Sequence, residues 1–254
     1  MNAEVVVLGS GTSSGVPTLG FEYPEGFLAN PKNHRSRPSI LFRTELGNVL
    51  VDCAPEMRLQ LFQEGVLSVE CVIVTHGHAD HIMGMDDLRG YSLKSGRAVL
   101  VYANEETQED IRRVFPYAFE PPPPGVMLPN FDVRPVPDVV RAAGLEIQTF
   151  PLVHGRWTVT GLRCRDFAYL TDVNLIPDES WAFLDGLETL VLDAVRYKPH
   201  PNHFNFEQAM DVARRIGART TYFTHLSHDY DHDAVEATMP PNIRLAYDGL
   251  RIPL

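Results

Sequence analysis

Three histidines and an aspartate lie within seven residues, THGHADH, directly after a run of apolar residues that we predict to be a buried β-strand. Alternate side chains of an extended chain face the same way, so His76 and His78 can point at one ion. Asp80 and His81, on the turn that follows, can point at a second ion beside the first. Burying these side chains together without a metal would leave charges and lone pairs uncompensated, so we predict a metal site here.

The types of these side chains restrict the metal. Imidazole nitrogens and carboxylate oxygens suit Zn²⁺, Mn²⁺ or Fe²⁺ better than Ca²⁺. Two such ions about 3.5–4 Å apart can clamp both the attacking and the leaving oxygen of a displacement reaction. We therefore expect two divalent ions, and Mn²⁺ and Zn²⁺ both accept this set of residues.

THGHADH matches the HxHxDH pattern of the metallo-β-lactamase-fold hydrolases, which the chain resembles. The resemblance implies an α/β (α+β) fold, an αββα sandwich of two mixed β-sheets flanked by helices, with two metals at the strand ends. It also implies three later ligands, and the sequence supplies them in order as His154 in PLVHG, Asp172 in YLTDV and His225 in FTHLSH.

The resemblance implies a division of the ligands between the two ions. Three histidines would bind the first ion: His76, His78 and His154. Three further residues would bind the second ion: Asp80, His81 and His225. Asp172 would bridge the two ions together with a water or hydroxide.

Other segments narrow the resemblance to one branch of this family. They are LGSGTSSGVPTLG at 8–20, HRSRPS at 34–39, DCAP at 52–55, HFN at 203–205, THLSHD at 225–229 and YDGLRI at 247–252. They resemble the phosphoribosyl cyclic phosphate phosphodiesterases of phosphonate breakdown and, more distantly, the tRNA 3′-processing ribonucleases. In both groups a histidine equivalent to His203 assists the leaving group, which needs a proton or a positive charge. We expect His203 and Asp80 to be catalytic.

The resulting hypothesis is a dinuclear metal-dependent phosphodiesterase that uses a metal-bound hydroxide. Its substrate would be a small sugar or nucleotide phosphodiester, cyclic or open. One alternative is a hydrolase of the same fold that cleaves a lactone, a thioester or a β-lactam. A second is a ribonuclease like tRNase Z, and a third is a domain that keeps its metal site for stability alone. A net charge of −11 disfavours a large nucleic acid as partner.

Some residues remain open between two roles. Arg35 and Arg37 are candidates for binding the substrate phosphate, or they belong to a solvated basic loop. Asp193 either orients a metal-ligating imidazole or caps the next segment.

One loop departs from the pattern of the phosphonate enzymes. Those enzymes carry a structural zinc bound by cysteines after GVPxxG, where this chain has Phe21, Tyr23 and Gly26. We therefore expect no structural zinc, and we expect packing of Phe21, Tyr23 and Phe27 to hold this loop.

The elements that must position these residues are many short strands with interspersed helices. We predict strands at 5–8, 39–42, 48–51, 71–74, 98–102, 145–151, 158–164, 166–170, 190–192, 220–223 and 245–246, and helices at 55–65, 107–114 and 207–216. Four prolines at 121–124 are interpreted as a surface loop rather than a linker, because the expected ligands fall on both sides of it. We therefore predict one domain over residues 1–254.

The composition indicates the cellular compartment and the partners of the protein. Its three cysteines, Cys53, Cys71 and Cys164, are far apart and fit a reducing compartment. The N-terminus lacks a signal-peptide pattern, and no segment reaches the roughly 20 apolar residues of a membrane span. We expect a cytoplasmic protein with a small phosphodiester substrate, no membrane partner, and assembly as a homodimer.

Overall fold

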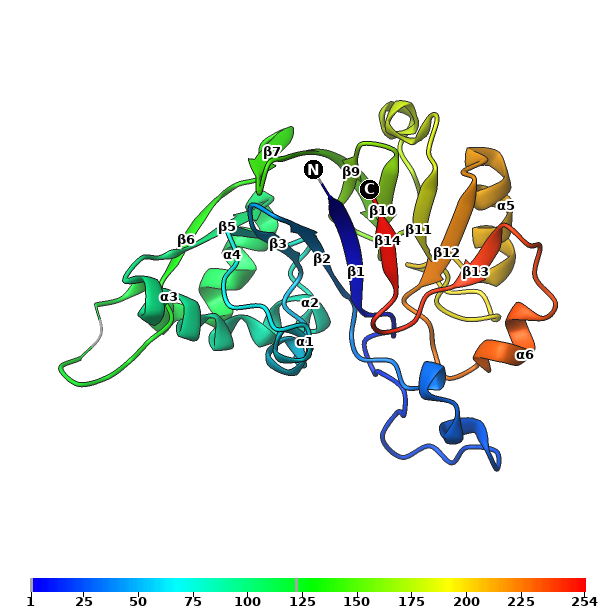
Figure 1. Cartoon of the computed structure of the whole chain (residues 1–254), viewed down its shortest axis with the longest axis horizontal. Coiled ribbons are helices and arrows are strands. Elements are labelled where there is room, and N and C mark those ends of the chain that lie inside the picture. The colour runs from blue at the N-terminus through cyan, green and yellow to red at the C-terminus, as the bar shows by residue number, and fades with distance from the viewer. Residues whose placement is uncertain (1, 122) are drawn as a thin grey trace.

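The computed structural model describes residues 2–121 and 123–254, so Pro122 of the proline loop lies outside the described residues. Its first β-sheet has seven strands (Figure 1). In spatial order they are β14 (Arg251–Pro253), β1 (Ala3–Gly9), β2 (Ser39–Thr44), β3 (Asn48–Val51), β4 (Cys71–Ile73), β5 (Val99–Ala103) and β6 (Phe131–Pro135). Pairing is antiparallel from β14 to β3 and parallel from β3 to β6, so the sheet is mixed.

The second sheet also has seven strands and is also mixed. In spatial order they are β13 (Ile243–Leu245), β12 (Thr220–Thr224), β11 (Thr189–Asp193), β10 (Phe167–Leu170), β9 (Trp157–Cys164), β8 (Leu145–His154) and β7 (Val139–Ala142). Pairing is parallel among β10 to β13 and antiparallel from β7 to β10.

Helices flank both sheets, as predicted. Figure 1 places four helices beside the first sheet: α1 (Met57–Gln63), α2 (Ala79–Ile82), α3 (Arg89–Ser95) and α4 (Glu105–Val114). Two helices lie beside the second sheet: α5 (Phe206–Ile216) and α6 (His232–Glu236). Short 3₁₀ helices lie in the connections: η1 (Phe27–Ala29), η2 (Pro31–Asn33), η3 (Met83–Leu88), η4 (Pro116–Phe119) and η5 (Asp178–Leu184). The expected αββα sandwich is confirmed.

Apolar layers between and outside the sheets explain the apolar runs of the strands. Along β1, Val5 and Val7 belong to a cluster that joins the inner faces of both sheets, whereas Val6 packs against the helices outside. Phe42 and Phe167 meet edge to face across the inner layer, with ring centres 5.9 Å apart. Because both faces of each sheet are covered, the central strands need apolar residues at every position.

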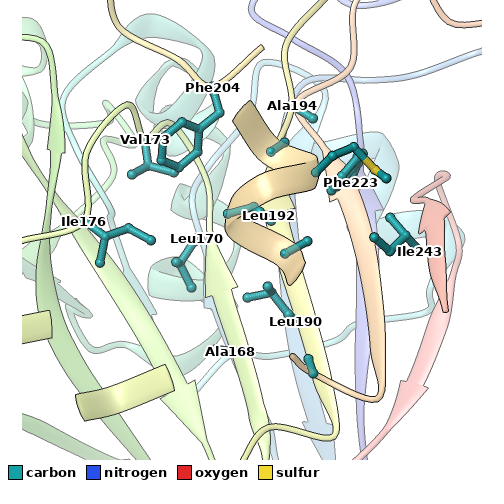
Figure 2. Packing of buried hydrophobic residues seen from close by; sticks show 14 of the residues in the cluster. Ala168, Leu170, Val173, Ile176, Leu190, Leu192, Ala194, Phe204, Phe223 and Ile243 are labelled. Atoms are coloured by element: carbon teal, nitrogen blue, oxygen red, sulfur yellow. The ribbon is translucent and has the colours of Figure 1, made fainter. Parts of the chain in front are cut away.

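The helix α5 closes the outer face of the second sheet (Figure 2). It starts with a capping box, in which the side chain of Asn205 accepts from Gln208 N and the side chain of Gln208 accepts from Asn205 N. It ends at Gly217, whose φ of 70° suits glycine. Its buried face packs on Leu190 and Leu192 of β11, so this helix fixes the strand that ends at Asp193.

Sequence patterns missed the strands at the sheet edges. β6, β7 and β14 were not predicted, and the strand predicted at 245–246 is observed as β13, two residues earlier. These strands have three to five residues and lie at or next to an edge, where partial solvent contact weakens the apolar pattern. Within the described residues, no helix has the length and apolar character that crossing a membrane requires. The single domain and the homodimer stay predictions.

Candidate metal centre

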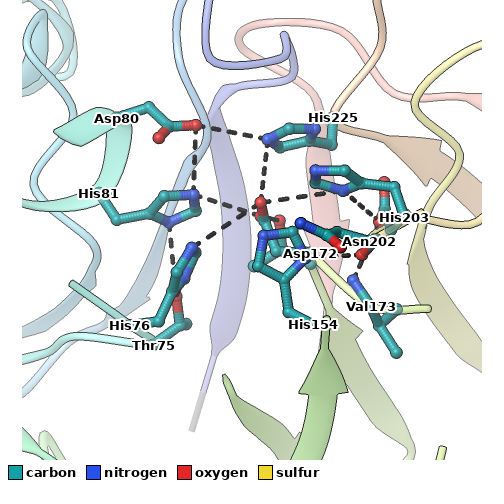
Figure 3. Close-up of polar contacts among 12 residues, drawn as sticks. Thr75, His76, Asp80, His81, His154, Asp172, Val173, Asn202, His203 and His225 are labelled. Atoms are coloured by element: carbon teal, nitrogen blue, oxygen red, sulfur yellow. Dashed lines mark hydrogen bonds and ion pairs between the residues drawn. The ribbon is translucent and has the colours of Figure 1, made fainter. Parts of the chain in front are cut away.

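The expected ligands converge where strands of both sheets end (Figure 3). The HxHxDH segment follows β4 of the first sheet, and His154 is the last residue of β8 in the second sheet. Asp172 and His225 follow β10 and β12, two strands on either side of β11. The centre therefore lies between the sheets, and it needs residues that are about 150 positions apart in the sequence.

The structure sorts these side chains into two groups that each suit one ion. The ligand atoms of His76, His78 and His154 lie within 4.8 Å of one another. A second group with the same spacing is formed by Asp80, His81, Asp172 and His225. Asp172 Oδ1 also lies 3.9 Å from His76 Nε2, so this carboxylate stands between the two groups. This geometry is compatible with the division of ligands that the resemblance implied, which stays a prediction.

Three of the expected ligand histidines are oriented through Nδ1, the ring nitrogen that faces away from the centre, whereas Nδ1 of His225 is buried without a hydrogen-bond partner among the described residues. His81 Nδ1 donates to Asp52 Oδ2 over 2.8 Å, and His154 Nδ1 donates to the carbonyl of Asn202 over 2.6 Å. His76 Nδ1 is hydrogen-bonded to the Thr75 hydroxyl at 3.1 Å. The inner Nε2 atoms of His76 and His81 are buried and lack a hydrogen-bond partner among the described residues. Inner nitrogens left free and outer nitrogens held by the protein are what metal-ligating histidines show.

The electrostatics of the two groups differ. Burial lowers the pKa of His76 well below its usual value and also lowers the pKa of His154, so both rings are neutral with a lone pair to offer. Burial opposes protonation of His81 as well, yet the carboxylates of Asp172, Asp52 and Asp80 raise its pKa well above the usual value. The carboxylates of this group therefore hold a proton on His81 when no metal is bound, and a divalent ion would supply the positive charge in place of that proton. The residues present fit two metal ions.

Three residues of the centre have a strained backbone. Asp52, Asp172 and His225 have φ values of 63°, 53° and 59°, in the left-handed region that side chains other than glycine rarely adopt. Such strain persists where surrounding contacts fix the residue, and it is concentrated at functional sites. For Asp172 and His225 it turns the side chain into the space between the sheets (Figure 3).

His203 lies beside the two groups and is held by Asp193. Its Nδ1 donates to Asp193 Oδ2 over 2.8 Å and lies 4.0 Å from Asp172 Oδ1. Its ring stacks on that of His225 at 4.7 Å, so the side chain is buried against the expected ligands. Of the two roles considered for Asp193, the structure therefore shows the orientation of an imidazole. The imidazole is that of His203, which is not one of the expected metal ligands.

The two candidate phosphate-binding arginines are already engaged. Arg35 is buried, and its guanidinium donates to the carbonyls of Tyr230 at 2.9 Å and Ser227 at 3.3 Å. Arg37 forms an ion pair with Glu56 at 2.7 Å. Arg35 therefore joins the loop after η2 to the segment that follows His225, which is a structural role.

The divergent loop is held by aromatic packing, as expected. Tyr23 stacks on Phe27 with ring centres 5.1 Å apart, and Phe21 packs on His228 at 4.3 Å. His228 comes three residues after His225, so the loop contacts the turn that carries an expected ligand.

Sequence analysis missed several residues that shape the centre. Asp52 lies in the DCAP segment but was given no role, and its carboxylate also accepts from the backbone and hydroxyl of Thr75.

Gly77 has no positive φ, so it is not needed for a turn. A side chain there would collide with Asp110 of α4, because a Cβ at position 77 would lie 2.7 Å from the Asp110 Cβ.

Comparisons with known proteins show the family of the chain. The family model described as the beta-lactamase superfamily domain matches residues 47–226. A solved structure described as a new diphosphatase from the PhnP family is 38% identical, covers 100% of this chain and 98% of that one, and superposes with a TM-score of 0.91.

Curated relatives include proteins of two other activities. An octanoyltransferase of Porphyromonas gingivalis is 35% identical over 251 residues, which are 96% of this chain and 50% of that protein. The chain thus spans about half the length of this relative. A ribonuclease Z of Pyrobaculum calidifontis is 24% identical over 87% of this chain and 93% of its own length.

Proposed function

The chain belongs to the beta-lactamase superfamily and is a metal-dependent hydrolase, and we propose that it cleaves a small phosphodiester. The observation that carries this proposal is the position of His203. A buried imidazole held by Asp193 lies against two groups of metal-ligating residues, where a leaving oxygen would need a proton. The PhnP-family diphosphatase supports hydrolysis at phosphorus, the broader class to which phosphodiester cleavage belongs.

Seven residues would hold two divalent ions: His76, His78, His154, Asp80, His81, His225 and Asp172. When bound, such ions polarise a phosphoryl oxygen and make water a better nucleophile at neutral pH. The carboxylates of Asp80 and Asp172 would offset the charge of the ions. Asp80 Oδ2 lies 3.4 Å from the Nε2 atoms of both His81 and His225, so these three atoms face one position. Mn²⁺ and Zn²⁺ are both compatible with these donors.

His203 would act on the leaving group through its other nitrogen. Because Nδ1 donates to Asp193, the proton that can be transferred is on Nε2. By accepting from Nδ1, the carboxylate of Asp193 keeps the ring from rotating. Protonation of the departing alkoxide by Nε2 completes the cleavage of the phosphorus–oxygen bond.

The substrate that we propose is small, because the chain carries a net charge of −11 and would repel an RNA backbone. The ribonuclease Z relative gives the second candidate, a ribonuclease. A hydrolase of the same fold that cleaves a lactone or a thioester is the third candidate.

The test is hydrolysis of bis-p-nitrophenyl phosphate by protein reconstituted separately with Mn²⁺ and Zn²⁺. We expect metal-dependent turnover that Asp80→Ala lowers by at least about 100-fold. Asp185→Ala, which removes an exposed carboxylate, is the matched control and should keep the wild-type rate. Turnover of lactones or thioesters in preference to phosphodiesters would contradict the proposal, and cleavage of pre-tRNA in preference would favour the ribonuclease.

A further inference from the structure

A groove between α1 and α3, away from the metal centre, is lined mainly by apolar side chains and has a volume of about 480 Å³. Three of these side chains are exposed, by 50%, 82% and 71% respectively: Leu59, Phe62 and Leu67. Three others are buried and belong to the apolar layer outside the first sheet: Met57, Leu61 and Val66. Exposed apolar side chains that gather in one concave surface are typical of a binding site.

The groove is held open by contacts between its two sides. The Tyr91 hydroxyl of α3 donates to the carbonyl of Val66, in the segment after α1, over 3.0 Å. On the inner side, Met57 packs closely on η3, because a Cβ built at Gly84 would lie 2.9 Å from the Met57 Cβ. Gly90 of α3 lines the groove, and a Cβ built there meets no atom within 4 Å. The space in the groove therefore exists before any ligand binds, which lowers the entropy cost of binding.

Two weakly engaged cations lie beside this apolar surface. Arg58 pairs with Asp87 at 4.0 Å, and since both side chains are largely exposed this pair contributes little to stability. Lys94 Nζ donates to the Leu67 carbonyl over 3.4 Å, which is its one hydrogen bond among the described residues. Arg58, Asp87 and Lys94 all line the groove, so two cations stand there against one carboxylate, in a chain of net charge −11. Such a surface suits a ligand that is apolar along its length and anionic at one end.

We propose that the α1–α3 groove binds a single straight acyl chain that ends in a carboxylate. The chain would lie against Leu59, Phe62 and Leu67, and the carboxylate would pair with Arg58 or Lys94. The volume of the groove falls within the range of about 300–1,000 Å³ that is usual for small-ligand sites. This inference does not depend on the proposed function, because none of these residues belongs to the metal centre.

A second copy of the chain fits the groove less well. In a two-fold dimer this surface would meet its own copy, which carries Arg58 and Lys94 as well. The excess positive charge would then meet positive charge. A fatty acid instead supplies one negative charge and an apolar chain in the same molecule.

The first test is isothermal titration of the metal-loaded protein with hexanoate, octanoate and decanoate, each below its micelle concentration. We expect each added CH₂ group to tighten binding by about 2- to 4-fold, since it removes more apolar surface from water. 1-Octanol, which has the same chain length as octanoate and no charge, should bind about 5-fold more weakly.

Three variants locate the ligand in the groove. Gly90→Leu should weaken octanoate binding at least about 10-fold, because the new side chain occupies the groove, while leucine suits a helix better than glycine and keeps the fold. Ser95→Leu is the matched control, since Ser95 is exposed on the same helix and does not line the groove. It should bind octanoate as the wild type does. The double variant Arg58→Gln, Lys94→Gln should remove the preference for octanoate over 1-octanol and leave the affinity for 1-octanol unchanged.

Four outcomes would overturn the proposal. One is equal affinity for the three fatty acids, and another is octanoate binding that requires metal and survives Gly90→Leu, since the carboxylate would then bind at the metal centre. The third is binding to vesicles that contain phosphatidylglycerol, without binding of octanoate, which would make the surface a membrane contact. The fourth is a dimer that Gly90→Leu dissociates in analytical ultracentrifugation, again without binding of octanoate.

Discussion

His203 Nδ1 donates to Asp193 Oδ2 over 2.8 Å, and the same carboxylate oxygen accepts the backbone N–H of Val173 at 2.9 Å. Val173 directly follows Asp172, the carboxylate that stands between the two groups of ligands. Asp193 is the last residue of β11, which α5 covers. One buried carboxylate thus fixes both the proposed acid and the backbone next to the proposed bridging ligand.

Asp193→Asn should lower kcat by about 10–100-fold, because a neutral amide holds the Nδ1–H of His203, and with it the ring, less firmly than the carboxylate does. Metal content, measured by plasma mass spectrometry, should stay at the wild-type level. The oxygen of asparagine can still accept from the Val173 N–H, so the effect of the substitution passes through His203. The same substitution in a His203→Ala background should therefore cost little further rate. Additive losses in the double variant, or loss of bound metal, would contradict this role.

Asp52→Asn should weaken metal binding by about 10–100-fold, since Asp52 fixes the ring of His81 through a bond of 2.8 Å. A competition titration with a chromogenic chelator measures the affinity. Glu146→Gln changes an exposed carboxylate that pairs with Arg141, and it serves as the control. Unchanged metal affinity in Asp52→Asn would show that Thr75 and neighbouring packing alone orient His81.

Much of the centre could be predicted because its ligands follow strands. HxHxDH after an apolar run, and single His or Asp residues after later runs, mark the carboxyl ends of strands that meet between the sheets. The structure brings all seven expected ligands and His203 together. The resemblance supplied the pairing of distant segments, which spacing alone does not contain.

Other features depend on tertiary contacts that no local pattern encodes. Arg35 lies in a polar stretch, yet it is buried because the carbonyls of Ser227 and Tyr230, almost 200 residues away, accept its hydrogen bonds. The partner of Asp193 depends on how the loop before α5 folds back onto β11. The need for glycine at position 77 comes from Asp110 on another element rather than from its own turn.

Gly77→Ala should destabilise the protein by about 1–3 kcal/mol, because the added methyl group overlaps Asp110 and moves the loop between His76 and His78. Urea unfolding with chelator present measures the free energy. Gly90→Ala is the matched control, since a Cβ at position 90 of α3 meets no atom within 4 Å. Alanine there should instead stabilise the helix by up to about 1 kcal/mol. Equal effects of the two substitutions would rule out the steric explanation.

The protein should lose stability below pH 6.5 through His232 on α6. Burial lowers the pKa of this histidine to about 4, although the nearby Glu236 carboxylate, at 3.6 Å, opposes that effect. As the pH falls, the unfolded chain therefore binds a proton on this histidine near pH 6.5, whereas the folded protein binds it only near pH 4. The stability that comes from the neutral form of His232 is fully present above pH 6.5 and is lost as the pH falls from there towards 4.

Between pH 7 and pH 5 this histidine should account for about 1–2 kcal/mol of the fall in unfolding free energy. Chemical unfolding at both pH values, with chelator present so that metal release does not contribute, measures the fall. His232→Leu should reduce the fall by that amount, whereas His34→Leu, at an exposed histidine, should leave it near the wild-type value. An identical fall in wild-type and His232→Leu protein would mean that His232 accepts its proton without unfolding, through a shift of α6 that exposes the ring.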